Sequence, residues 1–186
     1  MSGNPPIADL IADLKRRRDA PARSIAVDLP FADGVYRFGL GRREIAELER
    51  LCGHKDLNGT WRPIGVGAIF GRLARGRALL PSGEPDWGAS AAEILAGEIV
   101  ERDCVETIRL GLIGGGTGVV AGETISVNPA LAMRLVETYV IGRPLDDAWT
   151  LAFAVLGARM YGVEVTRGSI AGANSSAGEK DEAPTL

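Results

Sequence analysis

Hydrophobic side chains recur at helical spacing along most of the chain. Positions three and four apart lie on the same face of a helix, so these stretches predict amphipathic helices that bury one face. Asn128 followed by Pro129 marks one helix start, because the asparagine side chain caps free N–H groups and proline needs no N–H bond in the first turn. The pattern predicts core helices over residues 42–53, 63–76, 91–113, 127–142 and 144–162.

A different pattern precedes these helices. Residues 24–40 contain two short stretches that are typical of β-strands. Asp33 and Gly34 lie between them, and this pair suits a hairpin turn. We identify no other good strand signal in the sequence. The predicted fold class is therefore mainly α, a small helical domain of about five helices with a short N-terminal β-hairpin.

The two ends of the chain differ from its centre. Residues 1–23 are predicted to form an N-terminal extension with a short amphipathic helix. Residues 24–164 are predicted to form a single compact, mainly helical domain, in which the proline- and glycine-containing segment 76–90 connects two helices. Residues 165–186 hold too few large apolar side chains to offset the entropy of ordering them, so we expect a disordered tail.

Composition narrows the class of protein. The 186 residues are 46% hydrophobic and carry a net charge of −3, which fits one soluble domain and gives no electrostatic reason to bind nucleic acid or an anionic membrane. Cys52 and Cys104 lie far apart without CxxC spacing, which is typical of free thiols in a reducing compartment. No apolar run is long enough for a membrane span and the N-terminus does not resemble a signal peptide, so we expect a cytoplasmic protein.

The glycine-rich segment from Gly114 to Gly118 is the most conspicuous candidate for a phosphate-binding loop. A dinucleotide-binding loop follows a strand and opens a helix, whereas this segment follows a predicted helix and has Val119 where a third glycine belongs. No lysine of the GK[ST] type follows it either. We interpret the segment as a helix C-cap and turn, and predict no cofactor.

Other residues that could carry chemistry are isolated. His54 is the single histidine, and with Cys52 it supplies too few ligands for a closed zinc site; no serine nucleophile motif accompanies it. The carboxylates between residues 98 and 106 are interpreted as a solvated helix face. We predict no catalytic and no metal-binding residues. These carboxylates are Glu98, Glu101, Asp103 and Glu106.

One apolar stripe in the N-terminal extension is a candidate for partner binding. A helix this short is marginal alone in water, so its stripe would be covered either by a partner's groove or by the chain's own core. Sequence leaves these two alternatives open. The basic run that follows, Lys15 to Arg18, could contact phosphates, but we interpret it as complementing the dipole of the preceding helix. The stripe consists of Ile7, Leu10, Ile11 and Leu14.

The order of these elements resembles a known family. A short strand runs into FGLGRREIAELE, one helix ends in LGLIGGG, another carries NPALAMRLVETYVIG, and an alanine-rich helix ends in MYG. Over about Gly34 to Val163 this order resembles the small tail proteins of gene transfer agents and related long-tailed phages, a family described as tail assembly chaperones and also as tail tube proteins. The resemblance implies a mainly helical fold with a short β element and carries over no catalytic residues.

The resemblance implies a non-enzymatic assembly chaperone that binds tail tube or tape-measure subunits. One alternative is a structural tail component retained in the particle. Another, from a different class, is a small nucleotide-binding enzyme or regulator that uses the Gly114–Gly118 loop.

Overall fold

The computed structural model describes residues 7, 9, 11, 23–75 and 100–164. Ser24–Val163 forms one compact unit. The expectations for the connection 76–90, the first half of the helix predicted from residue 91 and the tail 165–186 lie outside the described residues.

The predicted N-terminal hairpin is present. Strand β2 (Ala26–Phe31) pairs antiparallel with β3 (Gly34–Gly39). The turn is one residue earlier than predicted, because Gly34 already pairs with Phe31 and the two-residue loop is Ala32–Asp33. Gly34 belongs in the strand for a packing reason: a Cβ there would collide with the carbonyl oxygen of Val119 on the next strand.

A second hairpin, absent from the sequence prediction, extends the sheet. Strand β6 (Thr117–Val120) pairs with β3 and with β7 (Glu123–Ser126), which gives the antiparallel strand order β2-β3-β6-β7. Ala121 and Gly122 join β6 to β7 with φ angles of 51° and 85°. Two consecutive positive φ angles are typical of a type I′ turn, which matches the twist of the flanking strands.

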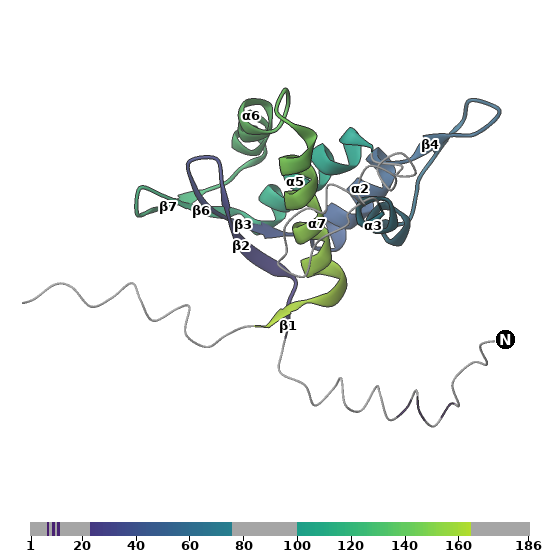
Figure 1. Cartoon of the computed structure of the whole chain (residues 1–186), viewed down its shortest axis with the longest axis horizontal. Helices are drawn as coiled ribbons and strands as arrows, with labels where there is room; N and C mark the ends of the chain where they lie inside the picture. The colour runs from purple at the N-terminus through teal and green to yellow at the C-terminus, as the bar shows by residue number, and fades with distance from the viewer. Residues whose placement is uncertain (1–6, 8, 10, 12–22, 76–99, 165–186) are drawn as a thin grey trace, which may run out of the picture. The chain divides into compact units, whose positions relative to one another are not determined.

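Among the described residues, four further strands are only two residues long. Strands β4 (His54–Lys55) and β5 (Trp61–Arg62) pair antiparallel in a small projecting hairpin (Figure 1), and β1 (Arg23–Ser24) pairs with β8 (Val163–Glu164). The mainly α fold class predicted from sequence is therefore wrong. The protein combines α-helices with a four-stranded antiparallel sheet and small additional sheets.

The described helices fall within or close to the predicted ranges. Asn128 caps α6 as predicted, because its side chain accepts a hydrogen bond from the Leu131 N–H at 2.8 Å. Observed helices are shorter than the predicted ones at several ends, where glycine, proline or a turn intervenes. They are α2 (Arg42–Leu51), α3 (Val66–Ala74), α5 (Glu101–Gly115), α6 (Pro129–Tyr139) and α7 (Leu145–Tyr161).

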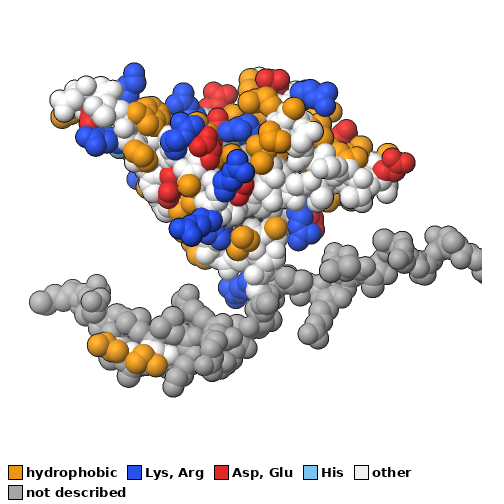
Figure 2. All heavy atoms as spheres, turned by 180° about the vertical axis from the view of Figure 1, so that it is seen from behind, with side chains coloured by type: hydrophobic (Ala, Val, Ile, Leu, Met, Phe, Trp, Pro, Cys, Tyr) orange, Lys and Arg blue, Asp and Glu red, His pale blue; other side chains and the backbone are white. Residues whose placement is uncertain are grey.

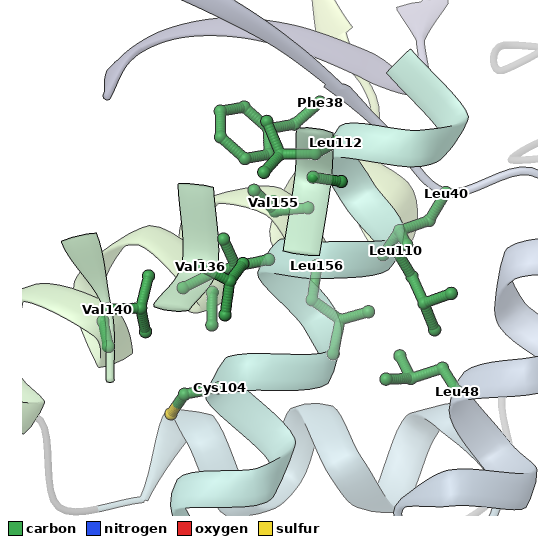
Figure 3. Close-up of a cluster of buried hydrophobic side chains, with 14 of the residues drawn as sticks. Phe38, Leu40, Leu48, Cys104, Leu110, Leu112, Val136, Val140, Val155 and Leu156 are labelled. Carbon is green, nitrogen blue, oxygen red and sulfur yellow. The ribbon is translucent and has the colours of Figure 1, made fainter. Parts of the chain in front are cut away.

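Helix α5 is the centre of the unit, with contacts to α2, α6, α7 and β3 (Figure 1). The same face of the sheet also meets α7, so Tyr36 and Phe38 of β3 are fully buried. Figure 3 shows Phe38 beside Leu112 of α5 and close to Val155 of α7. Val35 and Val119, which pair across β3 and β6 on the opposite face, are each 44% exposed. One face of the sheet therefore forms the core and the other faces solvent.

Candidate functional site

The glycine-rich segment ends a helix, as predicted. Gly116 is the C-cap of α5 and adopts the left-handed conformation at φ 69°. Gly114 and Gly115 let the helix approach β3, since a Cβ on either would collide with the carbonyl oxygen of Gly39 or Arg37. Carbonyl groups at a helix C-terminus carry partial negative charge, so this location disfavours a phosphate.

Gly118 lies in strand β6 and lets this strand pack against Tyr36 of β3. It pairs directly with Tyr36, and an added Cβ would lie 2.6 Å from the Tyr36 ring. The segment therefore continues from a helix cap into strand β6, which the sequence prediction missed.

His54 and the two cysteines do not form a joint site. His54 is exposed on β4, while Cys52 and Cys104 are buried free thiols. Burial raises the pKa of both thiols, to about 12 for Cys104, so neither is a ready nucleophile. In the part of the chain that the structure describes, no group of three or more His, Cys, Asp or Glu side chains could hold a metal ion.

Asp103 corrects one sequence interpretation. Its side chain is 1% exposed, not part of a solvated helix face, and Arg72 of α3 binds it with an Nε–Oδ2 distance of 2.7 Å. Arg72 also donates through Nη2 to the carbonyl oxygen of Cys52 at 3.2 Å. This pair joins the end of α2 to α3 and α5. Of the other carboxylates, Glu101 is exposed, Glu106 pairs with Arg109 at 2.7 Å, and Glu98 lies outside the described residues.

The buried pair carries an electrostatic cost. Burial raises the pKa of the Asp103 carboxyl, and the neighbouring Arg72 guanidinium opposes that rise. Asp103 Oδ1 and Thr107 Oγ1 are buried without a hydrogen-bond partner among the described residues. Asp103 joins three helices through Arg72, so we assign the pair a structural role.

An apolar groove lies between β2, the end of α6 and the first half of α7. Helix α6 ends at Tyr139, and the N–H groups of Val140 and Ile141 both bond the Val136 carbonyl oxygen, at 2.9 and 3.0 Å. Gly142, at φ 80°, then turns the chain towards α7. This tight connection places Tyr139 against Phe31 of β2, with ring centroids 6.2 Å apart.

Eight of the ten described lining residues are apolar, and the groove holds a volume of about 380 Å³, within the range of small-ligand and side-chain pockets. Asp147 is the one charged residue among them, and it lies in the first turn of α7. Phe31 forms the inner wall, because its ring also packs edge-on against Tyr36 and Phe38 at 5.9 and 5.8 Å. The lining comprises Leu29, Pro30, Phe31, Tyr139, Val140, Asp147, Ala148, Thr150, Leu151 and Ala154.

Sequence reasoning missed this groove, although one signal was present. Helix α7 is apolar on more than one side: Trp149, Ala152 and Leu156 are buried in the core as predicted, while Leu151 and Ala154 face the groove. A helix that is apolar around most of its circumference needs a second apolar contact. Helical spacing in the sequence predicts that Leu145, Trp149, Ala152, Leu156 and Met160 line one buried face of this helix, but Leu145 and Met160 at the two ends of that face are exposed.

The edges of the four-stranded sheet are poor templates for strand addition. β2 and β7 are its outer strands in the described structure. β2 carries Pro30, which has no N–H to donate, and β7 spans four residues and begins with Glu123. Proline, charge and short length are devices that keep sheet edges from pairing with other chains. The groove therefore offers side-chain contacts rather than an extended backbone ladder.

A second hollow, of about 710 Å³, lies between α2 and α5 and is more polar. Arg50 at its border pairs with Glu47 at 2.7 Å. Figure 2 shows charged and hydrophobic side chains interspersed on the face seen from behind. Exposed ion pairs of this kind are ordinary surface features. We therefore take the apolar groove as the candidate site.

The predicted partner-binding stripe is only partly described. Ile7 and Ile11 are exposed, at 76% and 47%, whereas Leu10 and Leu14 lie outside the described residues. Partner binding by this stripe stays a prediction.

No known protein family, characterised protein or solved structure matches the chain. Among the described residues, no helix is long and apolar enough to cross a membrane.

Proposed function

We propose that the protein is a non-enzymatic tail morphogenesis protein, an assembly chaperone that binds unassembled tail tube or tape-measure subunits of a phage-like particle. It would act in the cytoplasm of the bacterial host cell. The resemblance of the element order to that of gene transfer agent and long-tailed phage tail proteins supports this proposal. The structural observation that carries it is the apolar groove between β2 and α7.

The chemistry of the groove suits a protein client. Unassembled tail subunits expose apolar docking surfaces and strand edges that would otherwise pair with one another. Leu29, Tyr139 and Leu151 offer a concave apolar surface for a client's side chains. Because Pro30 interrupts the outer edge of β2, the chaperone would bind such a client without joining its growing sheet.

Polymerisation of purified tail tube subunits tests the proposal. Light scattering should show a longer lag when the full chain is added at an equal molar concentration, and a matched amount of an inert protein should have no effect. An unchanged lag would contradict a chaperone role for the tube subunit. If the chain instead accelerates assembly and is found at high copy number in purified particles by mass spectrometry, it is a structural tail component.

A further inference from the structure

The small hairpin formed by β4 and β5 has a hydrogen-bonded turn at its tip. Asp56 organises the turn: its Oδ1 accepts the N–H groups of Asn58 and Thr60 at 3.0 and 2.9 Å, and its own N–H donates to the Thr60 carbonyl oxygen at 2.9 Å. Gly59 completes the turn at φ 77°. Asp56 Oδ2 pairs in addition with Arg62 Nε at 3.0 Å.

The base of the hairpin is fixed to the helical part of the unit. Trp61 Nε1–H donates to the carbonyl oxygen of Arg50 in α2 at 2.8 Å. The Arg102 guanidinium of α5 lies over the Trp61 ring, 5.8 Å from its centroid. Gly53 permits this close approach, because a Cβ there would lie 2.8 Å from Trp61 Nε1 and would collide with the Arg62 carbonyl oxygen.

This turn presents Leu57 completely exposed to solvent. A single exposed leucine is unremarkable by itself. Here, however, the hydrogen bonds of Asp56 to Asn58 and Thr60 hold it at the end of a projecting hairpin, and Lys55, two residues earlier on β4, is also exposed. The tip therefore presents an apolar side chain, Leu57, together with the positive charge of Lys55, and these two residues are called the knob.

The groove between β2 and α7 is complementary to the knob in polarity and in charge. It is apolar, and Asp147 is the one charge among the described residues that line it. Figure 1 places the β4 hairpin and the β2–β3 turn on opposite sides of the helices. A chain therefore cannot insert its own Leu57 into its own groove, and the knob of one copy can reach only the groove of another.

We propose that the chain self-associates head to tail, with the Leu57 tip of one copy inserted into the groove of the next and Lys55 facing Asp147. A contact between two different surfaces of the same protein is heterologous, so repetition produces a ring if the rotation closes and a linear chain if it does not. The contact involves only this chain and needs no tail client.

Sedimentation of the full chain over a range of concentrations tests the proposal. Leu57→Glu and Ala154→Glu, which place a charge on the knob and in the groove, should each raise the concentration needed for association roughly tenfold or more. Val119→Glu, on the solvent face of the sheet, is the matched control and should associate like the parent. A monomeric parent, or a control that loses association equally, would overturn the proposal.

Mixing the two variants tests the head-to-tail geometry. The Leu57→Glu chain keeps an intact groove and the Ala154→Glu chain keeps an intact knob. An equimolar mixture should therefore form a heterodimer at a concentration at which neither variant associates alone. Heterodimer formation also shows that both variants are folded. If the mixture stays monomeric while each variant melts like the parent, the knob does not enter the groove.

Charge exchange tests the pairing of Lys55 with Asp147. Lys55→Glu and Asp147→Lys should each weaken association, and a mixture or double variant that restores opposite charges should recover part of it. No recovery in variants that keep the parent's circular dichroism spectrum would contradict this pairing. Leu57→Glu should still delay tube polymerisation, so loss of self-association and loss of client binding are distinguishable results.

Discussion

At the scale of single residues, the buried pair of Asp103 and Arg72 gives the sharpest stability prediction. Asp103→Ala leaves the Arg72 guanidinium, 13% exposed, without its carboxylate. Breaking a buried pair by removing one partner costs about 3 kcal/mol or more, because the remaining charge stays buried. Urea unfolding of Asp103→Ala should therefore show a loss of this size. Glu101→Ala, at an exposed position of the same helix, is the control, and an equal loss in both variants would contradict the buried pairing.

Tyr36 gives a prediction that depends on pH. Burial and a 2.6 Å hydrogen bond to Asp33 Oδ1 raise the pKa of its phenol to about 12. Because the unfolded state loses this proton near pH 10, the folded state binds more protons between pH 10 and 12, and stability falls as pH rises through that window.

Absorbance of tyrosinate during an alkaline titration should therefore show one tyrosine titrating about two units late. Asp33→Asn should lower the pKa of Tyr36, because it removes the nearby negative charge. A late titration that survives Tyr36→Phe would assign it to another tyrosine.

At the scale of elements, local signals identified the helices and the first hairpin. The Asn128–Pro129 start of α6 and the apolar spacing of α7 are local signals, and each led to the correct helix. The β6–β7 hairpin was missed because the glycines before it indicate a helix end, and its Ala121–Gly122 turn is a weaker signal than Asn-Gly or Asp-Gly. The β-branched residues on both sides of that turn favour strands and could have indicated this hairpin.

The burial of Asp103 and the formation of the groove both depend on contacts between residues that are far apart in the sequence. Asp103 pairs with Arg72, 31 residues earlier, so helical spacing alone placed its carboxylate incorrectly among solvated residues. The groove joins Phe31 to Tyr139 and Leu151, which come together only when the sheet packs against α6 and α7. Local sequence patterns therefore did not identify this surface.

Alanine substitutions of two helical glycines, Gly114 and Gly157, test whether α5 packs directly on the sheet. Gly157 of α7 has open space where a Cβ would go, so Gly157→Ala should raise the free energy of unfolding by up to about 1 kcal/mol through helix propensity. Gly114→Ala has the same propensity gain but collides with the Gly39 backbone, so it should lower stability by roughly 1–3 kcal/mol. Thermal and urea unfolding give both values. Equal gains would show that α5 does not lie directly on β3.

At the scale of the whole molecule, the two proposals share one surface. A client in the groove and the Leu57 tip of a second copy would exclude each other, because both occupy the space lined by Phe31 and Leu151. Self-association would then keep the apolar groove covered until a tail subunit competes for it. Higher chain concentration should weaken apparent client binding, and Leu57→Glu should remove that dependence.

The most direct measurement is calorimetric titration of monomeric tail tube subunit into the full chain and two variants. Ala154→Glu fills the groove with a charged side chain, while Val119→Glu alters an exposed position on the other face of the sheet. The parent and Val119→Glu should bind with similar affinity, and Ala154→Glu should bind at least about tenfold more weakly while keeping its melting temperature. Undiminished binding by Ala154→Glu, or no binding by the parent to tube and tape-measure subunits alike, would contradict a groove-based chaperone.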